Sequence, residues 1–313
     1  MPVVCLPDSD PRVLAMLGDL PDSVDIVVWD GVADAPERLA ETEFWAPSPD
    51  WAAQDDPAQV VARMPALKVI QLSSAGVDNV LRYVPDGVAL CDARGVHGGA
   101  VAEWVLTAIL ASLRDFPRFV RGQDTERWDP TTTDELAGKR VLIVGAGDLG
   151  EQTARRLAPF DVEVTMSARH ARDGRDGGVV HGQDELPQLL PAADIVVLLV
   201  PLTAETTGLI DAALLAALPD GALLVNAARG AVVDTDALVA ELTSGRLRAV
   251  LDVTDPEPLP AEHALWKAPN LLITPHIAGN VAGLPRRAHA LIGDQIRRYA
   301  AGTELINVVS GDY

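Results

Sequence analysis

The sequence is poor in cysteine, with only Cys5 and Cys91 among its 313 residues. Two cysteines exclude the disulfide framework on which small secreted domains depend. Both lie in or beside apolar, strand-like runs, which indicates buried free thiols. Cysteine and histidine nowhere cluster at the spacing of metal ligands, so the sequence predicts no metal site.

Basic residues are also scarce: 25 lysines and arginines face 45 aspartates and glutamates, which gives a formal net charge of −20. This balance argues against nucleic acid or an anionic membrane as a partner. The apolar runs, such as residues 195–200, have the length of strands, and none is long enough to span a bilayer. Because no N-terminal segment has the pattern of a secretory signal, we expect a cytoplasmic protein.

The most informative stretch is residues 141–150, where four apolar residues run into a G-x-G-x-x-G pattern and a helix-like segment follows. In a dinucleotide-binding turn Gly145 permits the sharp turn, Gly147 lets backbone approach a pyrophosphate, and Gly150 lets helix and strand pack closely. The start of the helix offers free N–H groups to the phosphates. Glycine-rich turns also close ordinary strand–helix corners, but the flanking pattern favours cofactor binding.

Short apolar runs alternate with helical segments along the whole chain, which is long enough for two domains. This rhythm predicts parallel sheets with helices on both faces. The first strand is followed by residues 7–10 (Pro-Asp-Ser-Asp) and not by a glycine fingerprint, so the first domain has a different task. The expected strands are residues 2–6, 25–29, 43–46, 67–72, 88–91, 141–144, 162–167, 194–200, 222–226, 249–253 and 271–274. The expected helices are residues 11–20, 33–41, 59–64, 101–116, 151–159, 186–190, 212–217, 235–243 and 285–300.

Polar side chains follow several of the later strands, where ligands of open α/β sheets bind. Arg229 comes after an apolar strand, and its guanidinium fits a carboxylate in two-point contact. His276 also stands at a strand end, and an imidazole can give and accept a proton near neutral pH. Glu257 would fix the tautomer of that imidazole if it lay beside it, which spacing alone does not establish. The alternatives are a loop-capping arginine and a structural histidine.

Taken together, residues 145–150, 226–230, 251–259 and 271–279 resemble the D-isomer-specific 2-hydroxyacid dehydrogenase family, which includes phosphoglycerate, glyoxylate/hydroxypyruvate and D-lactate dehydrogenases. Residues 73–79 resemble the substrate loop of that family, and other matching segments extend the resemblance along nearly the whole chain. The resemblance implies an α/β protein of two Rossmann-like, doubly wound parallel-sheet domains. A flavodoxin-like substrate domain would comprise residues 1–96 and 281–313, and a dinucleotide-binding domain residues 97–280. It also implies a homodimer formed through the dinucleotide-binding domain.

The resemblance also implies roles for single residues. Arg229 would hold the carboxylate and carbonyl of the substrate, while Glu257 would orient His276 and keep it protonated. His276 would give a proton to the carbonyl oxygen as hydride arrives from the nicotinamide, with Ser74, Ala75 and Gly76 as the substrate's carboxylate cradle. The residues implied to contact the cofactor are Gly145, Gly147, Asp148, Leu149, Gly150, Pro201, Thr206, Ala227, Asp252 (to the nicotinamide amide) and Gly279.

The second strand of the dinucleotide domain departs from the family pattern. It usually ends in an acid that hydrogen-bonds the adenosine ribose, which favours NAD. Here Ala168 stands near that position, and Arg169 follows. We therefore expect a preference for NADP(H), with Ser167, Arg169 and His170 around the 2′-phosphate. The alternative, exposed arginines on a surface loop, leaves NAD(H) possible.

Residues 44–54 lie where relatives with phosphorylated substrates carry basic side chains, but this chain has Trp45 and Trp51 there instead. The sequence also lacks the C-terminal regulatory domain of many phosphoglycerate dehydrogenases. We therefore expect a small unphosphorylated 2-oxo acid, glyoxylate- or hydroxypyruvate-like, as substrate; alternatively, the two tryptophans simply pack the domain. His97 replaces an asparagine common in the family, and the sequence assigns it no role.

The sequence thus predicts an enzyme, an NADP(H)-dependent 2-oxo-acid reductase with His276 as general acid and base. One alternative is an NAD-dependent D-2-hydroxyacid or phosphoglycerate dehydrogenase. Another is a dinucleotide-sensing binding protein of the same fold without catalytic activity. The presence of Arg229, Glu257 and His276 together favours the enzyme, because a sensor needs no proton donor.

Overall fold

The computed structural model describes residues 1–49, 51–53, 56–175 and 177–310. The chain divides into two compact units. Unit 1 comprises Met1–His97 and Ala282–Tyr313, and unit 2 comprises Gly98–Val281. The sequence placed the corresponding boundaries at residues 96/97 and 280/281. The chain therefore passes from unit 1 to unit 2 directly after His97, and it returns after Val281.

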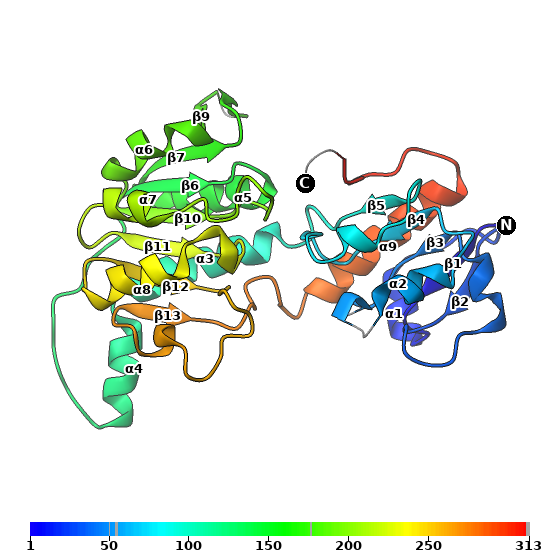
Figure 1. Cartoon of the computed structure of the whole chain (residues 1–313), viewed down its shortest axis with the longest axis horizontal. Helices are drawn as coiled ribbons and strands as arrows, with labels where there is room; N and C mark the ends of the chain where they lie inside the picture. The colour runs from blue at the N-terminus through cyan, green and yellow to red at the C-terminus, as the bar shows by residue number, and fades with distance from the viewer. Residues whose placement is uncertain (50, 54–55, 176, 311–313) are drawn as a thin grey trace. The chain divides into compact units, whose positions relative to one another are not determined.

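Unit 1 is built on a parallel sheet of five strands in the order β2-β1-β3-β4-β5 (Figure 1). This is the flavodoxin-like order, in which the sheet grows in both directions from β1. The strands are β1 (Val3–Leu6), β2 (Asp25–Val28), β3 (Phe44–Trp45), β4 (Val69–Gln71) and β5 (Ala89–Cys91). The helices are α1 (Pro11–Met16), α2 (Pro57–Ala62) and α9 (Leu284–Ala300).

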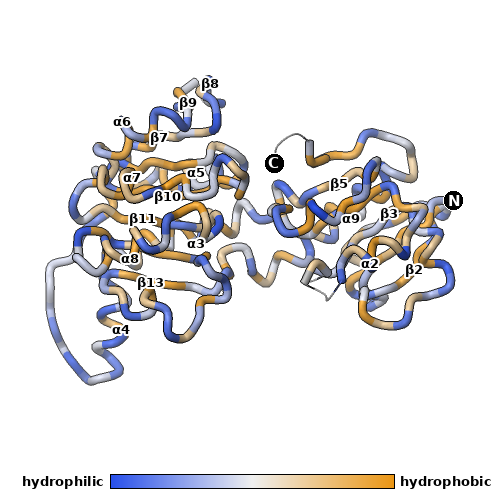
Figure 2. The backbone as a smooth tube through the Cα atoms, in the orientation of Figure 1, coloured by the Kyte–Doolittle hydropathy of each residue, from blue (hydrophilic) through white to orange (hydrophobic). Residues whose placement is uncertain are grey.

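Alternate residues of these strands enter opposite layers of the core, as the strand period of two requires. Val4 and Leu6 pack with residues of α9 and with Leu17, which follows α1. Cys5, between them, packs on the other face with Trp45 and with residues of α2. Apolar sequence therefore coincides with the strands (Figure 2).

Unit 2 is built on a sheet of eight strands in the order β13-β12-β11-β10-β6-β7-β9-β8, in which only β8 runs antiparallel to its neighbour. Its strands are β6 (Arg140–Val144), β7 (Glu163–Ala168), β8 (Arg172–Asp173), β9 (Val179–Gly182), β10 (Ile195–Leu198), β11 (Leu223–Asn226), β12 (Arg248–Leu251) and β13 (Leu271–Ile273). Its helices are α3 (Gly98–Leu113), α4 (Phe116–Asp124), α5 (Asp148–Leu157), α6 (Leu186–Leu189), α7 (Ala212–Ala217) and α8 (Thr235–Thr243).

This order is the doubly wound arrangement that the sequence predicted. The chain builds outward from β6 through β7 and β9, returns to β10 on the other side of β6, and continues to β13. Leu142 and Val144 of β6 pack toward α7 and α8, whereas Val141 and Ile143 pack toward α3 and α5. The strand order reverses between β6 and β10, and the crevice at such a reversal is where open α/β sheets bind ligands.

Two sequence expectations differ from the structure. The helix expected at residues 33–41 is only a short 3₁₀ turn, Glu37–Glu41, because Pro36 is extended and disfavours helical backbone at the residue before it. Trp45 and Trp51 are each 1% exposed, and their rings meet edge to face at 4.9 Å in the core of unit 1. The packing alternative for these tryptophans is therefore correct. Residues 50, 54 and 55 of this neighbourhood lie outside the described part.

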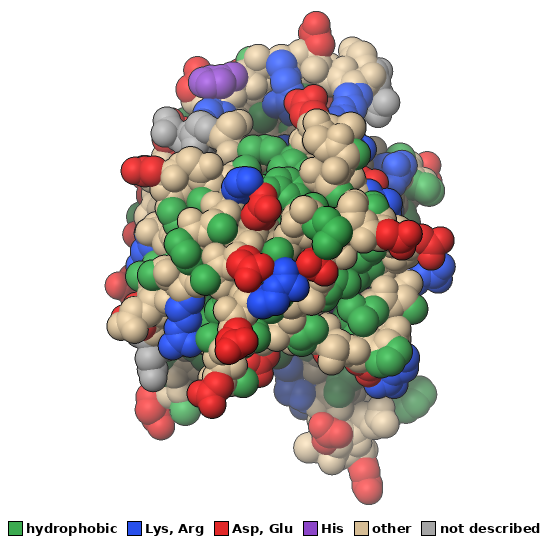
Figure 3. Space-filling model, turned by 90° about the vertical axis from the view of Figure 1, so that its right-hand side faces the viewer, with side chains coloured by type: hydrophobic (Ala, Val, Ile, Leu, Met, Phe, Trp, Pro, Cys, Tyr) green, Lys and Arg blue, Asp and Glu red, His purple; other side chains and the backbone are tan. Residues whose placement is uncertain are grey.

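The acidic excess is dispersed on the face of the molecule in Figure 3, where red, blue and green side chains are intermixed. In unit 1, Arg38 pairs with both Asp25 and Glu41, and Lys68 pairs with Glu43. None of the described helices has the length and hydrophobicity that crossing a membrane requires. Within the described ranges, no group of three or more His, Cys, Asp and Glu side chains could hold a metal ion.

Candidate active site

The glycine-rich turn connects β6 to the start of α5 in unit 2. Gly145 adopts φ +119°, and a Cβ there would lie 2.6 Å from the backbone of Leu199. A Cβ at Gly150 would lie 1.9 Å from the carbonyl oxygen of Gly145. By contrast, the Cβ direction of Gly147, the N-cap of α5, has no atom within 4 Å. The turn is thus tight at its two ends and open in the middle, which fits a pyrophosphate against the helix N-terminus.

Asp148 introduces an acid into this turn, and one oxygen of its carboxylate is buried. A Cβ at Gly98, the first residue of α3, would lie 2.2 Å from Asp148 Oδ2, so this oxygen packs against that helix start. The positive end of the α3 dipole offsets part of the negative charge there. Among the described residues this buried oxygen has no hydrogen-bond partner.

Four further loops follow parallel strands at the same edge of the sheet. The loop after β10 carries Pro201 and Thr206, and Thr206 Oγ1 donates to the Pro201 carbonyl oxygen at 2.6 Å. The loop after β11 carries Ala227 and Arg229. Asp252 and Glu257 follow β12, and His276 and Gly279 follow β13. Because the strands are parallel, their carboxyl ends meet at one edge, and the sheet brings these candidates together.

Glu257 and His276, which come from two different loops, are in direct contact. His276 Nδ1 lies 2.6 Å from Glu257 Oε1, so the imidazole donates to the carboxylate. The two side chains are 47% and 39% exposed, respectively. This contact was left open by the sequence. It turns Nε2 away from the carboxylate, where it can exchange a proton with a ligand.

The backbone of His276 is held in an unusual conformation. Its φ is +53°, in the left-handed region that non-glycine residues rarely adopt. The His276 N–H donates to the carbonyl oxygens of Asp252, at 2.7 Å, and Thr274, at 3.0 Å. These bonds offset a backbone strain of about 1 kcal/mol or more, which is the kind of strain that functional sites retain.

Asp252 fixes the rest of this loop with its side chain, which is 3% exposed. Its Oδ1 accepts from Thr274 Oγ1 at 2.6 Å and from the Ile277 N–H at 2.9 Å. Its Oδ2 accepts from the Ala278 N–H at 2.9 Å. One buried carboxylate therefore sets the position of the histidine loop, which is a role the sequence did not reveal.

Arg229 is positioned by its own loop. Asn226, at the end of β11, accepts from the Ala228 N–H at 2.9 Å and donates to the Arg229 carbonyl oxygen at 3.0 Å. Gly230 packs so closely that a Cβ there would lie 2.0 Å from the backbone of Thr254. The loop that carries Arg229 therefore packs closely against the segment that leads to Glu257.

The end of β7 carries the basic residues expected around a 2′-phosphate. Arg169 Nε lies 2.6 Å from Glu205 Oε2, and the two side chains are 41% and 55% exposed. Arg172 Nη2 donates to the Ala146 carbonyl oxygen in the glycine-rich turn at 2.7 Å. His170 is exposed. Ser167 is 1% exposed, and among the described residues its hydroxyl has no hydrogen-bond partner, so it reaches a phosphate only if it turns outward.

The residues expected to form the carboxylate cradle, Ser74, Ala75 and Gly76, lie in unit 1 on the loop after β4. Ser74 Oγ donates to the Gly76 carbonyl oxygen at 3.0 Å, and the Ser74 carbonyl oxygen accepts from the Ala93 N–H at 2.9 Å. His97 Nε2 donates to the carbonyl oxygen of Ser73 at 2.9 Å. The sequence assigned His97 no role. His97 is the last residue of the first segment of unit 1, and its hydrogen bond fixes this end of the segment to the loop. The only signal in the sequence was that a histidine replaces the asparagine common in the family.

The chain is similar to known proteins along most of its length. The family model "D-isomer specific 2-hydroxyacid dehydrogenase, NAD binding domain" matches residues 106–278. The chain is 39% identical over 233 residues to a glyoxylate reductase of Thermofilum pendens, covering 71% of this chain and 68% of the relative. It is 31% identical over 302 residues to a glyoxylate/hydroxypyruvate reductase A of Klebsiella pneumoniae, covering 89% and 96% of the two chains.

Among solved structures, the chain is similar to a D-isomer specific 2-hydroxyacid dehydrogenase of Xanthobacter autotrophicus Py2, determined in complex with NADPH and MES. The TM-score is 0.84 at 34% sequence identity, and the match covers 99% of this chain and 98% of the other. Fold, site and matches define the class of protein as a nicotinamide-dinucleotide-dependent oxidoreductase. Within that class, the chain belongs to the D-isomer specific 2-hydroxyacid dehydrogenase family, whose substrates are small 2-oxo and 2-hydroxy acids.

Proposed function

We propose that the protein uses NADPH to reduce a small unphosphorylated 2-oxo acid, such as glyoxylate or hydroxypyruvate, to the corresponding 2-hydroxy acid, which is the D isomer wherever C2 becomes a stereocentre. The observation that carries the proposal is the 2.6 Å contact between His276 and Glu257. It lies at the same sheet edge as Arg229 and the glycine-rich turn. An acid–base pair, a carboxylate-binding cation and a dinucleotide turn are the parts that this reaction needs.

The turn and the loops after β10, β11, β12 and β13 would hold the cofactor, with contacts from Gly145, Gly147, Asp148, Leu149, Gly150, Pro201, Thr206, Ala227, Asp252 and Gly279. When bound, a nicotinamide cofactor supplies the hydride. Arg229 and the loop of residues 74–76 bind the substrate carboxylate. His276 donates the proton from Nε2 to the carbonyl oxygen, while Glu257 accepts from Nδ1 and holds the ring in that orientation.

The preference for NADPH rests on the chemistry after β7. Ala168 ends the strand where an acid would bind the ribose 2′-hydroxyl of NADH, and Arg169 and His170 follow it. A guanidinium is a strong partner for a phosphate monoester. Glu205 already pairs with Arg169, so a 2′-phosphate must take the arginine from that carboxylate.

We also propose a homodimer formed through unit 2. Helix α4 and the segment after it present large apolar side chains to solvent: Phe116 and Val120 are each 59% exposed, and Trp128 is 95% exposed. A cavity of about 570 Å³ lies beside them and is lined by Phe119, Trp128 and Pro130 among others. Such a surface is typical of protein–protein interfaces.

The experiment is a rate measurement at the reduced-nicotinamide absorbance band. NADPH and NADH are compared against glyoxylate, hydroxypyruvate, pyruvate, phenylpyruvate and phosphohydroxypyruvate. We expect the highest kcat/KM for NADPH with an unphosphorylated acid. A kcat/KM for phosphohydroxypyruvate well above that for glyoxylate would instead favour the phosphoglycerate dehydrogenase alternative. Equal kcat/KM values for NADH and NADPH would favour the NAD-dependent alternative.

A His276→Gln variant separates catalysis from binding. Loss of a general acid lowers turnover about 10²- to 10⁴-fold, while NADPH binding, followed by its fluorescence, persists. Undiminished turnover in this variant would refute His276 as proton donor. Cofactor binding by the native protein without turnover of any acid in the panel would favour the sensor alternative.

A further inference from the structure

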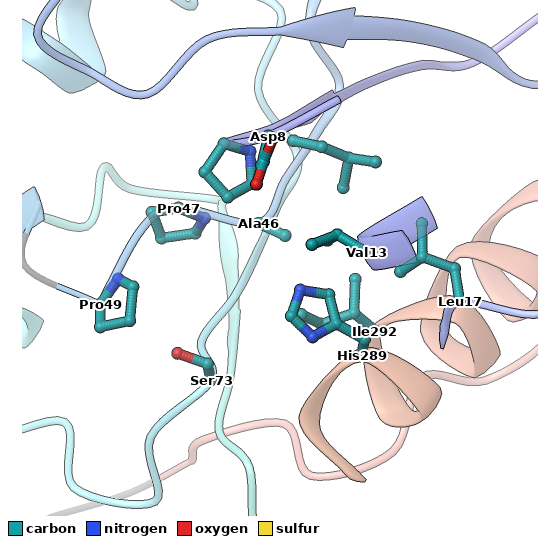
Figure 4. A pocket seen from close by; sticks show the side chains of 11 residues that line it. Asp8, Val13, Leu17, Ala46, Pro47, Pro49, Ser73, His289 and Ile292 are labelled. Atoms are coloured by element: carbon teal, nitrogen blue, oxygen red, sulfur yellow. The ribbon is translucent and has the colours of Figure 1, made fainter. Parts of the chain in front are cut away.

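Unit 1 contains a cavity of about 80 Å³ at the carboxyl ends of β1 and β3 (Figure 4). Strands β1 and β3 are neighbours in the sheet, and the strand order β2-β1-β3-β4-β5 reverses its direction between them. From β1 the chain leads to β2 on one side, and it returns to β3 on the other. The loops at such a point diverge and leave a crevice, and this is where flavodoxin-like sheets bind their ligands.

The walls of this switch-point cavity are mainly apolar. Leu6, Ala46 and three prolines come from the ends of the strands, and Val13, Leu17 and Ile292 come from α1, its C-cap and α9. The polar side chains of the lining are Asp8, Ser73 and His289. No lysine or arginine is among these described lining residues. A second anionic group would therefore meet the Asp8 carboxylate there. Arg12 attracts this carboxylate from α1 but is itself paired with Asp10 at 2.5 Å.

The switch-point cavity borders the proposed carboxylate cradle. Ser73 lines the cavity, and the next three residues are the cradle itself. Successive Cα atoms are about 3.8 Å apart, so the cradle begins one residue from the cavity wall. The loop is fixed on this side, because His97 Nε2 lies 2.9 Å from the Ser73 carbonyl oxygen. A 2-oxo acid bound by its carboxylate on the cradle thus has an adjoining space for its side chain.

His289 gives this space a defined hydrogen-bonding character. Its Nδ1 lies 2.7 Å from the carbonyl oxygen of Pro285, and a carbonyl only accepts, so Nδ1 carries the proton. In the neutral ring Nε2 is then an acceptor. Figure 4 shows the imidazole turned from α9 toward the strand ends, on the side where Asp8 and Ala46 lie. The Asp8 carboxylate is a second acceptor. Either acceptor, His289 Nε2 or Asp8, can therefore receive a hydrogen bond from a hydroxyl group.

We propose that the switch-point cavity receives the C3 side chain of the substrate and selects a short, uncharged side chain that carries a hydroxyl group. This inference rests on the proposed function and narrows its substrate class to hydroxypyruvate-like acids. The apolar walls accept the methylene group, and the single hydroxyl proton is donated to either His289 Nε2 or the Asp8 carboxylate. Asp8 also repels a side-chain carboxylate or phosphate.

The size of the cavity is tested with Val13→Phe, which fills the space from α1. Glyoxylate has no side chain and is the internal control, so its turnover also reports that the variant folds. We expect the ratio of kcat/KM for hydroxypyruvate to that for glyoxylate to fall at least about tenfold. Leu14→Phe, on the same helix but outside the cavity lining, should leave the ratio unchanged.

The chemistry of the cavity is tested with two pairs of acids. Hydroxypyruvate and 2-oxobutyrate differ by a hydroxyl in place of a methyl group, and His289→Leu should reduce the preference for hydroxypyruvate about fivefold. Oxaloacetate places a carboxylate on C3, and Asp8→Asn should raise its kcat/KM relative to 2-oxobutyrate about tenfold. Asp19→Asn, an exposed acid of unit 1 outside the lining, is the matched control.

The outcomes separate this inference from the proposed function. If the native protein turns over none of these acids with either cofactor, the proposed function itself fails. If it turns over glyoxylate and hydroxypyruvate but Val13→Phe, Asp8→Asn and His289→Leu leave all three ratios unchanged, the reaction stands and the switch-point cavity is not the side-chain site.

Discussion

Replacing Arg169 by alanine tests the cofactor preference at its most specific point. Arg169 follows β7, and its partner Glu205 follows β10, while β6 with the glycine-rich turn lies between these two strands. The ion pair therefore reaches across the crevice at which the strand order reverses. A 2′-phosphate on this side competes with Glu205 for the same guanidinium.

The magnitude follows from the two interactions that are exchanged. A hydrogen-bonded contact with a charged phosphate contributes about 1.5 to 3 kcal/mol. The Arg169–Glu205 pair is 41% and 55% exposed, and surface pairs of this kind contribute about 0 to 1 kcal/mol. The net preference assigned to Arg169 is thus about 2 kcal/mol, or about thirtyfold in kcat/KM.

The assay is the ratio of kcat/KM for NADPH to that for NADH at saturating 2-oxo acid. Arg169→Ala should lower the ratio about thirtyfold, whereas Glu205→Gln, which removes the competing carboxylate, should raise it a few-fold. Arg155→Ala, an exposed arginine on α5 outside the crevice, is the control. A ratio that Arg169→Ala leaves within twofold of the native value would refute the reasoning.

Three further predictions concern positioning and stability. His97→Ala should raise the KM for the 2-oxo acid about fivefold with a smaller change in kcat, because the hydrogen bond to Ser73 is lost, and His97→Gln should restore it in steady-state kinetics. If His97→Ala and His97→Gln have the same KM for the 2-oxo acid, the hydrogen bond from His97 to Ser73 does not contribute to substrate binding. Asp252→Asn should lower the free energy of unfolding by about 1 to 3 kcal/mol in denaturant titrations, because an amide N–H₂ replaces an acceptor that faces backbone N–H groups; an unchanged midpoint would contradict this. Lys68 and a tyrosine hydroxyl lower the pKa of Glu43 below 4.5, so its stabilisation is present above about pH 4.5 and is lost as the pH falls through the lowered value. The free energy of unfolding of Glu43→Gln should therefore fall less steeply with decreasing pH than that of the native protein in the same titrations. An equal slope of this free energy against pH would argue against the lowered pKa of Glu43.

The fold was predictable because its signals are local. Alternation of apolar and polar segments gave the parallel sheets, and the sequence bounds of α7 and α8 agree with those observed. The short strands β8 and β9 were missed, because Arg172 and Asp173 carry no strand pattern and are paired only through the sheet. Helix α4 was not among the expected helices, since its large apolar side chains are not covered by the rest of unit 2 as those of a core helix would be.

The candidate site was predictable in its residues but not in its contacts. A strand end followed by a polar side chain marks Arg229 and His276 from sequence alone. The bond from His276 to Glu257 joins residues 19 apart in the chain, and the bond from His97 to Ser73 spans 24 residues. Whether residues this far apart in the sequence come into contact depends on the order of the strands in the sheet. The spacing of residues along the chain does not encode that order. The burial of Ser167 likewise depends on which face of β7 it occupies.

Asp252 shows how one side chain can serve both the loop and the cofactor. A carboxylate offers about four acceptor sites on its two oxygens. Thr274 and the Ile277 N–H occupy two on Oδ1, and the Ala278 N–H occupies one on Oδ2. About one site on Oδ2 remains, which is enough for one of the two N–H donors of a carboxamide. We therefore expect the same aspartate that fixes the His276 loop to orient the nicotinamide, so proton donor and hydride donor would share one support.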